Sequence, residues 1–189
     1  MLCEHGRLAT EDNTPDLNSP MAALRGASET LALSLASKGV RASVVRLPPT
    51  NHGEGDHHGF IAQAVALARN KGASAYVGDG LNRWCATHRL DTARVFRLAF
   101  EKGDAGSVFH AVAEEGVRFS DIAEVIGRQL CIPVVSKSRQ EAREHFGFLA
   151  FAVLEDNPTS SKKTQEALGW SAQHPSLISD LESGSYFRD

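Results

Sequence analysis

The sequence predicts an α/β fold, and two observations carry this prediction. Helical and extended patterns alternate along most of the 189 residues, with short apolar runs between amphipathic stretches. Glycine directly follows two of the helical stretches, at Gly39 and Gly72, where it is expected to end each helix. A doubly wound sheet normally begins with an apolar strand, a glycine turn and a helix. Residues 8–20 are instead polar and predict a loop.

The first helix and the first strand are predicted next to each other. A helix at 21–38 follows Pro20, because proline suits the first turn of a helix. A strand at 40–47 is apolar and ends at Pro48 and Pro49, which cannot continue a sheet ladder. Together they form one helix–strand unit at the start of the fold.

Local signals place the remaining elements. Residues 50–59 are polar and predict a loop, and Ser120 is expected to cap the helix that follows it, with Glu124 in a loose capping arrangement. Further helices are predicted at 60–71, 91–101, 121–130, 140–146, 161–168 and 177–182, and further strands at 74–77, 108–112 and 132–136.

The composition argues against several classes of protein. A hydrophobic fraction of 42% with 23% charged residues is typical of a globular domain. The net charge is -3 and no dense Lys/Arg run occurs, so we expect no nucleic-acid partner. No apolar stretch reaches the roughly twenty residues of a membrane span, and no secretory signal is recognisable. The three cysteines, Cys3, Cys85 and Cys131, are scattered, which favours a cytoplasmic location without disulfides.

One glycine-rich stretch needs an interpretation. Gly78 and Gly80 follow the predicted strand 74–77, but Arg83 holds the position of a third glycine and no helical pattern follows. A dinucleotide pyrophosphate needs a helix N-terminus directly after such a turn. The stretch therefore predicts a tight turn.

Residues 44–56 carry the clearest functional pattern. They form a strand end that leads into a polar loop, which is the usual place for a ligand in an open α/β sheet. Arg46, His52, Gly53, Gly55 and Asp56 follow one another there in a spacing that resembles the segment after the sixth strand of extended short-chain dehydrogenases/reductases of the NAD-dependent epimerase/dehydratase type.

Other segments are similar to the same family and follow in the same order. The helix that contains Glu29 falls where the family has its Tyr-x-x-x-Lys helix. Residues 82–91 resemble the family's Val-His-x-x-Asp segment, 106–111 a later strand, and 160–170 the late Ser-x-x-x-Thr-x-x-x-Leu-Gly-Trp segment of atypical members. The resemblance covers about residues 8–187.

The resemblance implies a partial Rossmann-type (doubly wound) sheet with a small mixed α/β substrate-binding domain. Residues 1–59 would be a remnant of the NAD(P)-binding domain, and 60–189 would form the substrate-binding side, with some segments returning to the Rossmann-type sheet. The implied activity is that of an NAD(P)-dependent oxidoreductase or sugar-nucleotide epimerase/dehydratase that acts on a small molecule, and a homo-oligomer would be consistent with it.

The resemblance also implies roles for particular residues. Pro48, Pro49, Thr50 and Asn51 would lie beside the nicotinamide of NAD or NADP. His52, Trp84 and His88 would bind substrate.

Two departures weaken the expected chemistry. Spacing back from Glu29 puts Met21 at the family's tyrosine position and Arg25 at its lysine position. A thioether cannot donate a proton, and an arginine stays protonated, so Arg25 can hold a ribose hydroxyl but cannot relay a proton. The family's Gly-x-x-Gly-x-x-Gly turn is also absent. We therefore expect a truncated member with impaired cofactor binding. The alternative is a catalytically silent homologue that acts as a binding module.

A second alternative rests on a histidine-rich loop. His52, His57 and His58 lie close to Glu54 and Asp56, and such side chains can bind a divalent metal ion. The surrounding glycines leave the ligand spacing undefined, so we expect a substrate-side loop without a metal. A small metal-dependent enzyme that uses His52, His57 and His58 remains the other interpretation.

Overall fold

The computed structural model describes residues 6–15 and 20–188, and it has an α/β fold as the sequence predicts. The helices are α1 (Pro20–Ser34), α2 (Phe60–Lys71), α3 (Arg89–Lys102), α4 (Phe119–Leu130), α5 (Arg139–Phe146), α6 (Ala150–Val153), α7 (Lys162–Leu168) and α8 (Leu177–Glu182), with short 3-10 turns η1 (Leu35–Lys38), η2 (Gly147–Leu149) and η3 (Ser185–Phe187). The strands are β1 (Val44–Arg46), β2 (Thr50–His52), β3 (Ser74–Val77), β4 (Arg83–His88), β5 (Val108–His110), β6 (Glu114–Arg118) and β7 (Val134–Lys137).

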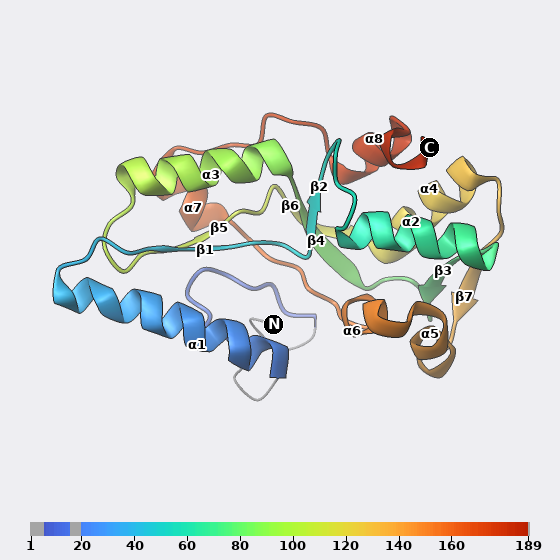
Figure 1. The fold of residues 1–189 in the computed structure, drawn as a ribbon, viewed down its shortest axis with the longest axis horizontal. Coiled ribbons are helices and arrows are strands. Elements are labelled where there is room, and N and C mark those ends of the chain that lie inside the picture. Colours follow the sequence, from blue (N-terminus) through green and yellow to red (C-terminus); the bar gives the residue numbers. More distant parts are fainter. Residues whose placement is uncertain (1–5, 16–19, 189) are drawn as a thin grey trace.

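One end of the molecule has three layers. Strands β1 and β5 run parallel, from Val44 opposite Val108 to Arg46 opposite His110. Helix α3 covers one face of this pair and α1 lies on the other side (Figure 1). Apolar side chains of α3, β5 and the α7 region form a core beneath α3: Val95, Leu98, Ala99, Phe109, Ala111, Leu168 and Trp170.

The other end contains a larger core. Strands β2, β4 and β6 form a mixed sheet, and β3 pairs with β7 in parallel. Helices α2, α4, α5 and α8 surround these strands (Figure 1). Trp84 of β4 is 1% exposed, and its indole N–H donates to the carbonyl of Ala152 at 3.0 Å. The ring packs against Phe60 and Phe119, which places Trp84 at the centre of this core.

The predicted helices are confirmed to within a few residues, and the glycine stops are confirmed as well. Gly39 and Gly72 have φ angles of 80° and 66°, the left-handed conformation that ends a helix. Gly78 and Gly80 form a tight turn between β3 and β4, with no helix behind it. No helix within the described ranges is long and apolar enough to cross a membrane.

Several local predictions are wrong. The predicted loop 50–59 contains β2, and neither β4 nor β6 was expected. The strand predicted at 40–47 is formed only by Val44–Arg46. Ser120 does not cap α4, because the buried Phe119 already belongs to the helix and Arg118 precedes it as the cap residue.

A close approach between α4 and the chain before β7 gives a test of this packing. A Cβ at Gly127 would overlap Val134 Cγ2 and lie 3.2 Å from the carbonyl oxygen of Ile132. We expect Gly127→Ala to lower the free energy of unfolding by about 1–3 kcal/mol, because overpacking outweighs the gain in helix propensity. Chemical denaturation measures this change. Val134→Ala in the same chain should relieve the overlap, and a stabilising Gly127→Ala would contradict the packing described.

Candidate functional site

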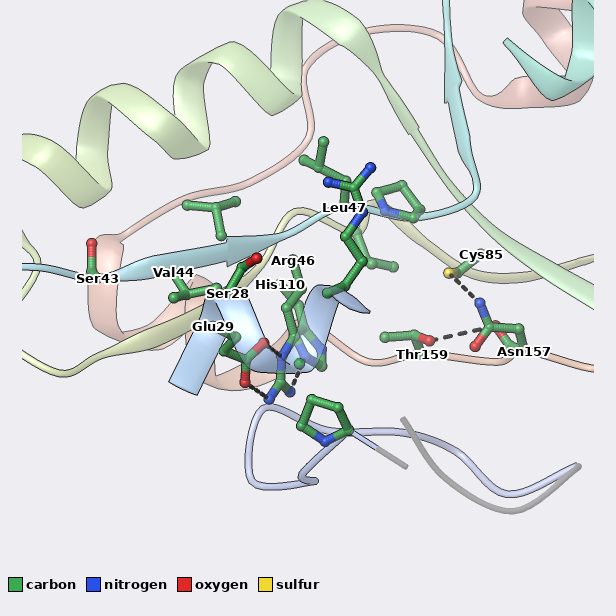
Figure 2. A pocket seen from close by; sticks show the side chains of 16 residues that line it. Ser28, Glu29, Ser43, Val44, Arg46, Leu47, Cys85, His110, Asn157 and Thr159 are labelled. Atoms are coloured by element: carbon green, nitrogen blue, oxygen red, sulfur yellow. Dashed lines mark hydrogen bonds and ion pairs between the residues drawn. The ribbon is translucent and has the colours of Figure 1, made fainter. Parts of the chain in front are cut away.

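A cavity of about 660 Å³ lies between α1, β1 and the chain around β4 and β5. It is lined by α1 and the segment before it (Pro15, Arg25, Gly26, Ser28, Glu29), by the β1 region (Ser43, Val44, Val45, Arg46, Leu47, Pro48), and by Cys85, His110, Val112, Asn157 and Thr159. Figure 2 shows a charged group around Arg46 on one side and Cys85, Asn157 and Thr159 on the other.

A largely buried ion pair forms the charged side. The Arg46 guanidinium donates to both carboxylate oxygens of Glu29, with Nη2 2.6 Å from Oε1 and Nε 3.0 Å from Oε2. The two side chains are only 11% and 13% exposed. This bidentate geometry joins α1 to the carboxyl end of β1 (Figure 2).

His110 adds a third hydrogen-bonded side chain to this pair. Its Nε2 lies 3.1 Å from Arg46 Nη1, and its Nδ1 lies 2.8 Å from the carbonyl oxygen of Ser160. A carbonyl only accepts a hydrogen bond, so His110 Nδ1 carries the hydrogen. Nε2 then accepts from Arg46, and the ring is neutral in this tautomer. Burial lowers the pKa of His110, and the Arg46 charge acts in the same direction, against the Ser160 hydrogen bond and the carboxylates of Glu11 and Glu29.

Apolar contacts contribute little to the attachment of α1. Among the side chains that the structure describes, neither of the two hydrophobic cores includes a residue of α1. Leu31, in the middle of the helix, is 66% exposed. The Glu29–Arg46 pair is therefore a direct polar contact between α1 and β1.

The opposite wall is polar but not charged. Asn157 Nδ2 lies 3.8 Å from Cys85 Sγ, and Thr159 Oγ1 donates to the carbonyl oxygen of Asn157 at 3.4 Å. Burial raises the pKa of the Cys85 thiol to about 12. Cys85 is therefore a protonated, poorly nucleophilic group, and this wall offers hydrogen bonds to a ligand rather than a nucleophile.

The segment 6–15 closes one side of the cavity. Ala9 forms a parallel bridge with Thr159, and Pro15 lines the cavity. The Glu11 carboxylate accepts hydrogen bonds from the backbone N–H and the hydroxyl of Thr164, at 2.8 and 2.7 Å. This segment is thereby fixed to the beginning of α7.

The residues expected at the cofactor divide into two groups. Arg25 and Pro48 line the cavity, whereas Pro49, Thr50 and Asn51 are not among its lining residues. Thr50 is 1% exposed, and the Asn51 side chain accepts a hydrogen bond from Thr92 at 2.6 Å. The side chain of Met21 lies outside what the structure describes. The cofactor-binding roles stay predictions.

The residues expected at the substrate do not line this cavity. His52 is 0% exposed and bonded to Asp180, and Trp84 lies in the large core. His88 precedes α3 and accepts the backbone N–H of Leu90 at 3.2 Å through Nδ1. Substrate binding by these three side chains stays a prediction, and the geometry gives them structural partners.

The histidine loop does not form a metal cluster. His52 is buried, whereas His57 and His58 are exposed at the surface of the loop before α2. Across residues 6–15 and 20–188, no group of three or more His, Cys, Asp or Glu side chains is placed to hold a metal ion. The geometry therefore gives no support to the metal-dependent alternative.

Sequence reasoning missed residues on both sides of the cavity. His110 on the charged side, and Asn157 and Thr159 on the opposite wall, were not expected to lie at a site, although each borders the cavity. His110 offered one signal, because it is a polar residue inside an apolar strand pattern and therefore needs buried partners. Asn157 and Thr159 gave none, because only the fold brings them beside β4.

Solved structures of proteins with bound NAD or NADPH share the fold. DesIV, a dTDP-glucose 4,6-dehydratase from Streptomyces venezuelae with NAD and TYD bound, superposes with a TM-score of 0.73 at 20% identity, over 95% of this chain and 54% of DesIV. RMD from Pseudomonas aeruginosa, complexed with NADPH, superposes with a TM-score of 0.70 at 18% identity, over 94% of this chain and 59% of RMD. MoeE5, in complex with UDP-glucose and NAD, superposes with a TM-score of 0.73 at 21% identity, over 97% of this chain and 60% of MoeE5. The chain thus has the Rossmann-like α/β fold of these enzymes.

Two yeast proteins are similar in sequence, and both are named as uncharacterized. C2A9.02 of Schizosaccharomyces pombe is 50% identical over 188 residues, which is 99% of this chain and 62% of that protein. YLL056C of Saccharomyces cerevisiae is 45% identical over 177 residues, 94% of this chain and 58% of that protein. The chain therefore spans about three fifths of the length of the curated relatives it matches. No family model matches it.

The buried pair at the cavity gives a second test. We expect Arg46→Met to lower the free energy of unfolding by about 3–5 kcal/mol, because Glu29 would remain buried without its partner. A loss of this size should lower the melting temperature by roughly 6–20 °C for a chain of this length. Differential scanning calorimetry measures both changes.

An exposed pair provides the matched control. Arg97 and Glu101 of α3 form an i,i+4 pair whose side chains are 68% and 50% exposed. Arg97→Met should cost no more than about 0.5 kcal/mol. Adding Glu29→Gln to Arg46→Met should recover part of the loss, because no uncompensated charge is then left. Equal effects of Arg46→Met and Arg97→Met would show that the buried pair does not hold α1.

Proposed function

We propose that this chain is the substrate-side part of an NAD(P)-dependent oxidoreductase or epimerase-like protein of the extended short-chain dehydrogenase type. The observation that carries the proposal is the extent of the fold similarity. Nearly all of this chain superposes on a little over half of each NAD- or NADPH-bound enzyme. The ligands of those enzymes are dinucleotides and sugar nucleotides, and we assign the same classes to the activity in which this chain takes part.

The open edge of β1 supports the proposal that the dinucleotide side continues beyond this strand. Within the described ranges β1 pairs only with β5, although parallel sheets usually consist of several strands covered on both faces. The cavity runs along β1 and is bordered by Arg25 and Pro48. A further strand at this edge would bring a dinucleotide domain next to both residues. We assign residues 1–59 to the dinucleotide side and 60–189 mainly to the substrate side.

The chemistry expected of the site is binding rather than proton transfer. Arg25 is exposed at the cavity and offers five N–H donors, which suits a ribose hydroxyl or a phosphate. Neither Met21 nor Arg25 can act as a general acid, and the Cys85 thiol is held protonated by burial. A catalytically silent binding module is therefore the second candidate, and a cytoplasmic location suits either function.

Dinucleotide titration tests the proposal. No Gly-x-x-Gly-x-x-Gly stretch occurs in the 189 residues, so the chain lacks the backbone N–H groups that hold a pyrophosphate. By isothermal titration calorimetry we expect whole C2A9.02 of Schizosaccharomyces pombe to bind NAD or NADP at about micromolar Kd. This chain should bind the same dinucleotide at least about a hundredfold more weakly.

Two results would contradict different parts of the proposal. Micromolar binding of a dinucleotide by this chain would show that its cofactor binding is not impaired. A whole relative that binds neither dinucleotide would remove the support for an NAD(P)-dependent function. A whole relative that binds a dinucleotide but turns over no sugar nucleotide would favour the binding module.

A further inference from the structure

His52 is a buried imidazole with only one of its two nitrogens paired. Its side chain is 0% exposed, and Nδ1 lies 2.9 Å from Asp180 Oδ2 on helix α8. A carboxylate only accepts, so Nδ1 carries the hydrogen of the neutral ring and Nε2 presents a lone pair. Within the described part of the chain, Nε2 has no hydrogen-bond partner.

A second carboxylate faces the unpaired nitrogen. Glu114 Oε1 of β6 lies 3.9 Å from His52 Nε2, which is too far for a hydrogen bond. Both atoms are acceptors when the ring is neutral, and an unpaired buried acceptor destabilises the fold. One proton on Nε2 would turn this repulsive pair into a donor and an acceptor.

Both carboxylates already hold helix α8. Glu114 Oε1 accepts the backbone N–H of Leu177, the first residue of α8, at 2.7 Å. Asp180 lies within α8, and its carboxylate is 10% exposed. A protonated His52 would therefore join Asp180 and Glu114 and connect α8 to β2 and β6 in one closed ring of hydrogen bonds.

The other titratable groups around His52 have hydrogen-bond or ion-pair partners of their own, so the added proton is assigned to His52. His88 of β4 meets His52 edge-on at 5.4 Å between ring centroids, and its Nδ1 accepts from Leu90. Burial lowers the pKa of His88, and His52 and His174 lower it further, against the opposing charges of Asp180 and Asp91. The lowered pKa of His88 disfavours a charge on this ring next to His52.

The remaining titratable groups near His52 each have a partner close by. His174 stacks on His88 at 4.8 Å and lies 3.1 Å from Asp91, which also binds Arg94. Arg89 donates to the carbonyl of Glu54. On η3, the Tyr186 hydroxyl donates to Asp56 and accepts the N–H of Gly53, next to His52, and burial raises its pKa.

We propose that His52 is a proton-operated lock for helix α8: uptake of one proton at Nε2 joins Asp180 and Glu114 through the imidazolium and fixes Leu177–Glu182 on the β2–β4–β6 sheet. Loss of that proton leaves two acceptors facing each other and loosens α8. Tyr186 follows α8 and holds the loop at Gly53, so release of the helix also frees this loop. The lock does not depend on whether the chain binds a dinucleotide.

The substitution Glu114→Gln distinguishes the effect of the proton on His52 from the effect of the hydrogen bond that Glu114 makes to α8. The glutamine oxygen can still accept the Leu177 N–H, while the side chain no longer carries the negative charge that favours a proton on His52 Nε2. Amide hydrogen exchange of Asp180 and Ser183, whose N–H groups bond within and just after α8, reports opening of the helix. Glu115→Gln is the matched control, because it removes the same charge from an exposed neighbour on β6.

In the parent chain the opening constant of α8 should rise severalfold between about pH 6 and about pH 8, with about tenfold per pH unit as the limit for one linked proton. Glu115→Gln should keep this slope and Glu114→Gln should make it shallower, because one of the two carboxylates beside the ring has then lost its charge while Asp180 remains. Comparing the variants at each pH cancels the contributions of His110 and His145, which burial shifts in the opposite sense. A slope in Glu114→Gln as steep as in the parent, or no slope in the parent, overturns the proposal.

Nitrogen-15 NMR of the parent chain gives an answer that does not depend on any variant. The His52 Nε2 resonance should change from its unprotonated to its protonated position over the same pH range in which α8 becomes protected. A resonance that stays unprotonated while the protection of α8 changes would overturn the proposal.

Discussion

The Arg46 guanidinium is the constraint on which the candidate site depends. It is largely buried and always charged, so it needs partners, and these come from two separate elements, Glu29 on α1 and His110 on β5. Neither hydrophobic core includes a described side chain of α1, so the polar contact helps to fix where the helix lies. Because α1 forms one wall of the cavity, the position of that wall follows from this one cation.

Two buried histidines show how similar residues receive different roles. Both nitrogens of His110 are used, one toward Ser160 and one toward Arg46, so this ring is a fixed part of the frame. His52 is equally buried but uses only Nδ1, toward Asp180. A fully paired imidazole stabilises a single arrangement, whereas a half-paired one leaves the structure sensitive to the proton concentration.

The helices and the α/β class could be predicted from the sequence because their signals are local. Helical periodicity and a following glycine placed α2 correctly at both ends. The strands β4 and β6 were missed because Arg83 and Glu114 make their ends appear solvated, whereas their charges are paired by Asp156 and by the N-terminus of α8. Tertiary partners overrode the local pattern there.

The candidate site was less predictable than the fold for the same reason. Its Arg46 lies in a recognisable segment, but its partner His110 is 64 residues away. Sequence spacing places Arg46 at the end of a strand and cannot reveal His110. The site is therefore defined by contacts between distant segments, which a pattern along the chain does not contain.

The contact between the beginning of the chain and α7 has a consequence for how the protein folds. Glu11 and Thr164 are 153 residues apart in sequence, and Ala9 pairs with Thr159. Loops of this length close slowly, because the entropy of the intervening chain must be lost before the contact is formed. During synthesis, the segment 6–15 leaves the ribosome long before its partners exist. The cavity therefore acquires its last wall only when residues 157–164 have been made, and helices such as α2 and α4 can form well before that.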